Sequence, residues 1–175
     1  MQTPKRYHPL LVTLHWLVAI LVLLNLSIGK FIFPDRDYPE IAAAIHMLAG
    51  MSVLALIIFR FIVRLRFPRP ADADSGSKLT DALARLVHYG LYVMLLVITG
   101  VGVSFALMSG RLARTFFGAG PASGPPPDSV FLLRGIHGLS ANLLLLLILL
   151  HVAAALFHQF IRKDNLIARM WYGPR

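Results

Sequence analysis

The chain has 175 residues, of which 57% are hydrophobic and only 14% are charged, and it contains no cysteine. This composition is far more apolar than that of a soluble domain, so it predicts an integral membrane protein. The absence of cysteine excludes disulfides, thiolate-ligated metals and haem attached through a C-x-x-C-H motif. The formal net charge of +9 does not indicate nucleic-acid binding, because the basic residues flank apolar runs rather than forming a soluble basic face.

Four apolar stretches follow one another along the chain, and each is long enough to cross a bilayer as a helix. They cover about residues 10–28, 41–63, 82–108 and 132–160. Residues 109–130 are rich in Gly and Pro, which excludes a continuous helix there. Modest loops between four spans predict an all-α fold, a single membrane domain over residues 1–175 built as an antiparallel four-helix bundle.

The basic residues divide unequally between the two sides of such a bundle. Twelve of the 17 Lys and Arg residues lie in the N-terminal, second-to-third and C-terminal segments, and five lie in the other two loops and their flanks. Cytoplasmic flanks of membrane helices carry the excess of Lys and Arg. We therefore expect both termini in the cytoplasm.

The fourth stretch contains three histidines, and an ionisable residue inside a membrane span indicates a functional site. His137 and His151 lie 14 residues apart, which places both rings on one helix face and separates them by roughly 21 Å along the axis. Each ring therefore lies near one side of a hydrocarbon core about 30 Å thick. This is the geometry expected for two sites stacked across the membrane.

Sorting the other histidines by depth gives a partner for each site. Only His46 lies at the outer depth of His137, so these two form the outer pair. The inner layer around His151 has three further histidines, namely His15, His88 and His158. His15 is the expected partner because it lies deeper in its helix than His88. Two imidazoles from different helices at one depth can bind a haem iron from opposite faces, in the apolar core of a bundle.

Other interpretations of these residues stay open. A single buried histidine in a span often makes an interhelical hydrogen bond, which would suit a haem-free transporter or structural bundle. A zinc site is less favoured, because no carboxylate lies inside any span to complete it. Gly50, one turn after His46, either lets a flat macrocycle approach the backbone or serves helix packing.

The segments around these histidines resemble the bacterial cytochrome b561 family. The likeness rests on LHWLVAI around His15, on IHMLAG around His46 followed by IVRLRFPRP, and on the stretch that begins at His137 and ends in FHQFIRKDNLIARM. It runs nearly from end to end. Within the family, the chain is most similar to the stand-alone four-span cytochromes that oxidise superoxide.

This resemblance implies two haem b groups in a protein of the bacterial inner membrane. The ligands that it carries over are His15 with His151 for the inner iron and His46 with His137 for the outer iron. It also implies oxidation of superoxide to oxygen at the outer face, with ubiquinone as electron acceptor and no obligate protein partner. His158 and His88 lie where a quinone could be hydrogen-bonded.

Basic residues on the outer side are candidates for steering the anionic superoxide by their positive field. They are Arg36, Arg111, Arg114 and Arg134. The alternative is that they are ordinary interfacial anchors. For the whole chain, the main alternative is a cytochrome b subunit that relays electrons between a dehydrogenase or hydrogenase partner and quinone, since such subunits use similar haem-binding bundles.

Overall fold

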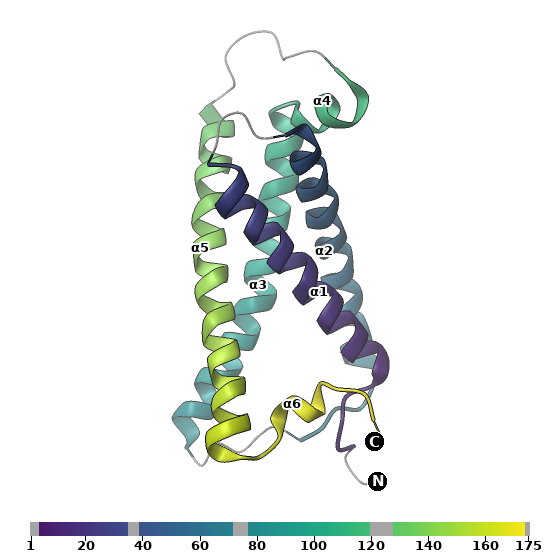
Figure 1. The fold of residues 1–175 in the computed structure, drawn as a ribbon, viewed down its shortest axis with the longest axis vertical. Coiled ribbons are helices and arrows are strands. Elements are labelled where there is room, and N and C mark those ends of the chain that lie inside the picture. Colours follow the sequence, from purple (N-terminus) through teal and green to yellow (C-terminus); the bar gives the residue numbers. More distant parts are fainter. Residues whose placement is uncertain (1–3, 35–38, 72–76, 120–127, 174–175) are drawn as a thin grey trace.

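Four long helices make up the fold. The computed structural model describes residues 4–34, 39–71, 77–119 and 128–173, and every regular element within these ranges is helical. The long helices are α1 (Pro9–Ser27), α2 (Glu40–Arg66), α3 (Lys78–Met108) and α5 (Asp128–Leu156). They run alternately up and down, and the chain enters and leaves at the same end of the bundle (Figure 1). The predicted all-α antiparallel bundle is confirmed.

Each long helix extends beyond the apolar stretch that predicted it. α1 continues through the π-helical turn η1 (Ile28–Ile32), and α5 continues through a second one, η2 (Phe157–Arg162). Two short helices, α4 (Arg111–Phe117) and α6 (Leu166–Arg169), have no counterpart in the sequence prediction. Both are shorter than the window in which hydrophobic periodicity is informative. Single π-helical turns often occur at functional sites.

The helices pack in chain order, with α1 on α2, α2 on α3 and α3 on α5 as the most extensive contacts. Aliphatic side chains from all four form the central cluster, namely Val18, Val22, Val53, Ile57, Leu95, Ile98 and Leu144. In lipid, the hydrophobic effect gives little drive for helix association, so close van der Waals packing has to hold this cluster together. Val53 and Leu144, with exposed fractions of 1% and 2%, lie at its centre.

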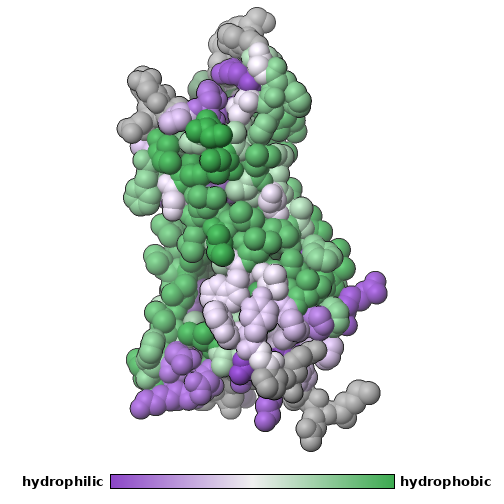
Figure 2. Space-filling model, turned by 45° about the vertical axis from the view of Figure 1, so that its right-hand side comes forward, coloured by the Kyte–Doolittle hydropathy of each residue, from purple (hydrophilic) through white to green (hydrophobic). Residues whose placement is uncertain are grey.

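Most apolar side chains outside this cluster point away from the bundle. Figure 2 shows a hydrophobic surface over the middle of the molecule and hydrophilic residues toward both ends. Ile20 and Leu149, for example, are more than half exposed. All four long helices are long and apolar enough to cross a membrane. The hydrophobic middle is therefore the surface that lipid covers.

The C-terminal segment is fastened to the start of α1. Trp16 Nε1 donates a hydrogen bond to the Met170 carbonyl at 2.9 Å, and the hydroxyls of Thr13 and Tyr172 lie 2.9 Å apart. Arg6 Nη1 donates to the Tyr172 carbonyl at 2.9 Å. Trp and Tyr side chains favour the lipid–water interface. These contacts hold the segment that follows α6 against the start of α1.

Candidate functional site

The outer histidine layer consists of two rings from different helices. His46 of α2 and His137 of α5 have ring centroids 6.1 Å apart, with an interplanar angle of 73°. A metal–imidazole bond is about 2 Å long and the ring centre lies about 1 Å further on, so two imidazoles on opposite sides of one metal ion have centroids about 6 Å apart. The spacing of His46 and His137 therefore fits two axial ligands of one iron.

The surroundings of His137 leave one ring nitrogen available. His137 Nδ1 lies 3.0 Å from the Ile98 carbonyl oxygen of α3, so Nδ1–H donates to that oxygen and Nε2 keeps its lone pair for a metal. Gly102, one turn after Ile98, also lies against the His137 ring. A Cβ at this position would lie 2.9 Å from His137 Cε1, so only glycine fits beside the ring. The sequence analysis missed Gly102, although its motif, TGVG, is visible.

His46 is contacted by Asn25 of α1, a residue that the sequence analysis also missed. With its amide oriented to satisfy both groups, Asn25 donates to the His46 carbonyl at 3.1 Å and accepts from the Gly50 N–H at 3.0 Å. Its nitrogen then lies 3.3 Å from His46 Nδ1. A Cβ at Gly50 would face the same amide at 3.7 Å. Gly50 therefore takes part in the packing of α1 on α2.

The inner layer brings three rings together instead of two. His15 of α1 lies 6.2 Å from His151 of α5 between ring centroids, which repeats the outer spacing. His88 of α3 is closer, at 5.1 Å from His151, and its Nδ1 lies 2.7 Å from the Ala84 carbonyl. A separation of 5.1 Å is short for two rings with a metal ion between them. The geometry therefore favours His15 as the partner of His151.

A cation lies beside this inner layer. The partly buried Arg60 of α2 donates to the Tyr92 hydroxyl at 3.3 Å, and its guanidinium lies 5.9 Å from the Tyr92 ring centre. Its charge acts on both His15 and His151. Among the described residues, no carboxylate is within salt-bridge distance of Arg60. Because a buried charge is costly without a counter-charge, this arginine suits an anionic group of a bound cofactor.

His158 lies in η2, two helical turns beyond His151. Its Nδ1 is 2.6 Å from Asp164 Oδ2, and Arg162 Nε is 4.0 Å from the same oxygen. Desolvation raises the pKa of Asp164, but the hydrogen bond and charge of His158, together with the Leu166 N–H and the charge of Arg162, bring the pKa below its ordinary value. The sequence analysis selected His158 but not Asp164, because the carboxylate lies outside the apolar stretch.

Three of the four outer arginines lie near one another. Arg111 and Arg114 are on α4 and Arg134 is on the first turns of α5, while Arg36 lies outside the described residues. Burial of Arg111, followed by the charges of Arg114 and Arg134, lowers the pKa of the Arg111 guanidinium. Three of the arginines selected from the sequence thus act on one another at the outer end of the bundle.

Within the described ranges, no three or more His, Cys, Asp or Glu side chains converge as the ligands of a metal ion. The zinc alternative thus has no complete ligand set in that part of the chain. Paired imidazoles suit a group that supplies its own equatorial ligands, as a haem does.

Comparison with known proteins identifies the family of the chain. A family model of prokaryotic cytochrome b561 matches residues 6–173. A Yersinia pestis protein named "Probable superoxide oxidase CybB" is 31% identical over 168 residues, which is 95% of this chain and 96% of the relative. "Cytochrome b562" of Cereibacter sphaeroides is 30% identical over 173 residues, 94% of each chain. "Cytochrome b561 homolog 1" of Escherichia coli is 29% identical over 172 residues, 95% of this chain and 97% of the relative. The chain belongs to the prokaryotic cytochrome b561 family, and it is therefore a multi-pass bacterial membrane protein of electron transport that binds b-type haem.

Proposed function

We propose that the protein oxidises superoxide to oxygen at the end of the bundle opposite its termini and delivers the electrons to ubiquinone at the other end. Two superoxide anions each lose one electron, and one ubiquinone gains two electrons and two protons to become ubiquinol. The observation that carries the proposal is the pair of histidine layers along α5, with ring spacings of 6.1 and 6.2 Å. The name of the Yersinia pestis relative supports superoxide as the electron donor.

Two haem b groups, one in each layer, would supply one-electron transfer across the membrane. His46 and His137 would hold the outer iron, and His15 and His151 the inner one. The hydrogen bond from His137 Nδ1 to the Ile98 carbonyl orients the ring with Nε2 free. Arg60 would hold a propionate carboxylate of the inner haem. This carboxylate would be its counter-charge, since it has no acidic partner among the described residues.

The arginines of the outer end would attract the substrate. Superoxide is a small anion. A cluster of positive charges attracts an anion, because the bound anion lowers the repulsion within the cluster. Burial lowers the pKa of Arg111 most, and the charges of Arg114 and Arg134 lower it further, which supports a cluster of these three arginines. We propose Arg36, which lies outside the described residues, as a further member.

The quinone would bind beside η2. His158 carries its imidazole at the end of the bundle that holds both termini, and Phe160 and Ile161 on the same turn are each 69% exposed. Such side chains face lipid in a membrane, which is where ubiquinone is dissolved. His88, which is closer to His151 than His15 is, is the second candidate for a quinone contact. Both termini, and hence the quinone site, would be cytoplasmic by the distribution of basic residues.

The test is anaerobic addition of superoxide to the purified protein, followed by absorption spectroscopy of the haem and by assay of ubiquinol. We expect fast haem reduction, then ubiquinol formation at one per two superoxide anions, and superoxide dismutase should abolish both. Haem that stays oxidised under superoxide would refute the donor. Co-purification of a dehydrogenase or hydrogenase that reduces the haem would then favour the relay alternative.

A further inference from the structure

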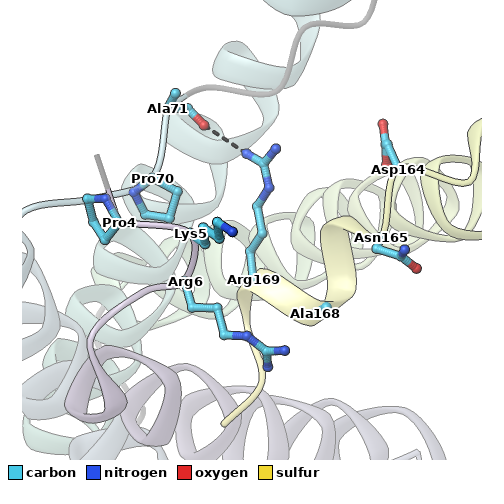
Figure 3. Close-up of a pocket in the computed structure, with 9 residues that line it drawn as sticks. All are labelled: Pro4, Lys5, Arg6, Pro70, Ala71, Asp164, Asn165, Ala168 and Arg169. Atoms are coloured by element: carbon cyan, nitrogen blue, oxygen red, sulfur yellow. Dashed lines mark hydrogen bonds between the residues drawn. The ribbon is translucent and has the colours of Figure 1, made fainter. Parts of the chain in front are cut away.

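One acidic side chain connects the proposed quinone site with the aqueous end of the bundle. Asp164 lies between η2 and α6, where it accepts from His158 at 2.6 Å. It also lines a hollow of about 450 Å³ formed by the N-terminal segment, the residues after α2 and α6. Figure 3 shows this hollow with Lys5, Arg6 and Arg169 around it, and Asp164 at its edge.

The two members of this pair differ in their access to water. The side chain of Asp164 is 32% exposed, while that of His158 is only 14% exposed. The carboxylate therefore reaches the solvated hollow, and the imidazole lies on the protein side of it. His158 Nε2 has no hydrogen-bond partner among the described residues. Its free edge is thus available to a ligand, while its other edge is bound to a carboxylate.

The backbone around Asp164 is fixed in an unusual conformation. Lys163 and Asn165, on either side of it, both adopt positive φ angles, 58° and 56°. Left-handed conformations of non-glycine residues are uncommon, and they persist only where the surroundings determine them. Gln159 Nε2 also bridges η2 to this turn by donating to Asn165 Oδ1 at 3.4 Å. The turn holds the carboxylate against His158.

Resting on the proposed function, we infer that Asp164 is a positioning residue that makes His158 the proton donor to the reduced quinone, with protons taken from the end of the bundle that carries both termini. The carboxylate accepts from Nδ1–H and stabilises the imidazolium, so that Nε2–H points to the quinone, as in other carboxylate–histidine pairs. In each transfer, the Nε2–H bond breaks as an O–H bond forms on a quinone oxygen that has received an electron. After the quinol leaves, a hydronium ion from the end that carries both termini restores the proton at Nε2 and becomes water, while Nδ1–H stays on the carboxylate throughout.

Other charged side chains lie near the Asp164–His158 pair. Arg162 of η2 lies 4.0 Å from Asp164 Oδ2, and Lys5, Arg6 and Arg169 surround the hollow. Arg6 and Arg169 donate to the backbone carbonyls of Tyr172 and Ala71, each at 2.8–2.9 Å. Of these cations, Arg162 favours the carboxylate form of Asp164.

The experiment uses protein whose haem has been reduced chemically, so that its outcome does not depend on superoxide. Reduced Asp164→Asn protein is mixed with a short-chain ubiquinone, and the rate of haem reoxidation is followed from pH 5 to pH 9. We expect full haem content and a rate about 10- to 100-fold below that of the unsubstituted protein. We also expect the pH profile of the rate to differ from that of the unsubstituted protein, since Nδ1–H has lost the carboxylate that accepts from it.

Controls separate positioning from a structural role. Asp164→Glu should restore most of the rate, and Asp128→Asn at the opposite end of α5 should change neither the rate nor the pH profile. His158→Gln should be as slow as Asp164→Asn, and the double variant no slower than either. An unchanged rate and pH profile in Asp164→Asn would overturn the inference. Failure of quinone to reoxidise the unsubstituted protein would instead overturn the proposed acceptor.

A pH-sensitive dye enclosed in vesicles tests the side of proton uptake. The protein is inserted in one orientation, established by proteolysis of its termini, and is reduced before quinone is added. We expect proton uptake from the side that carries the termini. Uptake from the opposite side would contradict the assignment of the hollow.

Discussion

The two histidine layers of the bundle are built differently. The outer layer has two rings, and α3 approaches His137 through the Ile98 carbonyl and at Gly102. The inner layer has three rings, and His151 lies within 6.2 Å of His15 and within 5.1 Å of His88. The outer layer therefore allows one pairing, whereas the inner layer has one more imidazole than an iron can bind axially.

The proposed function gives the two ends of the molecule different roles. An outer site with a fixed pair suits a haem edge that meets a small diffusing anion. An inner site with a spare imidazole, the cation Arg60 and the His158–Asp164 pair has the groups that a proton-coupled acceptor needs. The predictions below test this contrast.

The largest expected effect is the loss of a whole haem. His46→Ala should remove the outer group and leave about one haem per chain, counted by pyridine haemochrome assay. His15→Ala should do the same at the inner layer, because its ring has the spacing of an axial partner. His88→Ala should keep two haems, as should His8→Ala, which changes the residue before α1. One haem in His88→Ala and two in His15→Ala would reverse the inner assignment.

The next effect concerns the close contact of Gly102 with His137. A methyl group at this position would lie 2.9 Å from the ring, and such overpacking costs about 1–3 kcal/mol. Gly102→Ala should therefore lower the occupancy of the outer haem and broaden its spectrum, while the inner haem is unchanged. Gly100→Ala is the matched control, since a Cβ there meets nothing within 4 Å. Equal spectra of the two variants would show that the His137 ring can shift away from the added methyl group without any effect on the outer haem.

A smaller effect should distinguish the inner haem electrostatically. A positive charge near a haem stabilises its reduced form, because reduction adds an electron. Arg60→Gln should lower the midpoint potential of the inner haem, on the order of tens of millivolts, and leave the outer potential unchanged. Tyr92→Phe keeps the charge and removes only the 3.3 Å hydrogen bond, so it should have little effect. Potentiometric titration of both haems measures this, and a shift confined to the outer haem would contradict the placement of Arg60.

The sequence predicted what depends on periodicity and depth. The apolar stretches gave the four long helices, and the spacing of His137 and His151 predicted two layers at opposite ends of α5. Contacts between helices were harder to predict from the sequence. Gly102 and Asn25 contact the outer histidines only because of how α3 and α1 rotate about their axes, which depends on packing. Asp164 meets His158 through a turn with two positive φ angles, a conformation that no apolar pattern encodes.

The smallest expected effect is a pH dependence that belongs to one end of the bundle only. The folded protein holds the pKa of Asp164 below its ordinary value through His158. The contact therefore contributes stability above the ordinary pKa of an aspartate, and this contribution is lost as the pH falls through the lowered value. Because the carboxylate is partly solvated, the contribution should be about 1 kcal/mol or less.

Thermal unfolding of the unsubstituted protein and of Asp164→Asn should differ at neutral pH and converge in acid. Hydrogen exchange should place the difference in η2 and α6, since the outer histidine layer has no part in this contact. A difference that persists unchanged into acid would mean that the substitution acts on the turn itself rather than on the charge of Asp164.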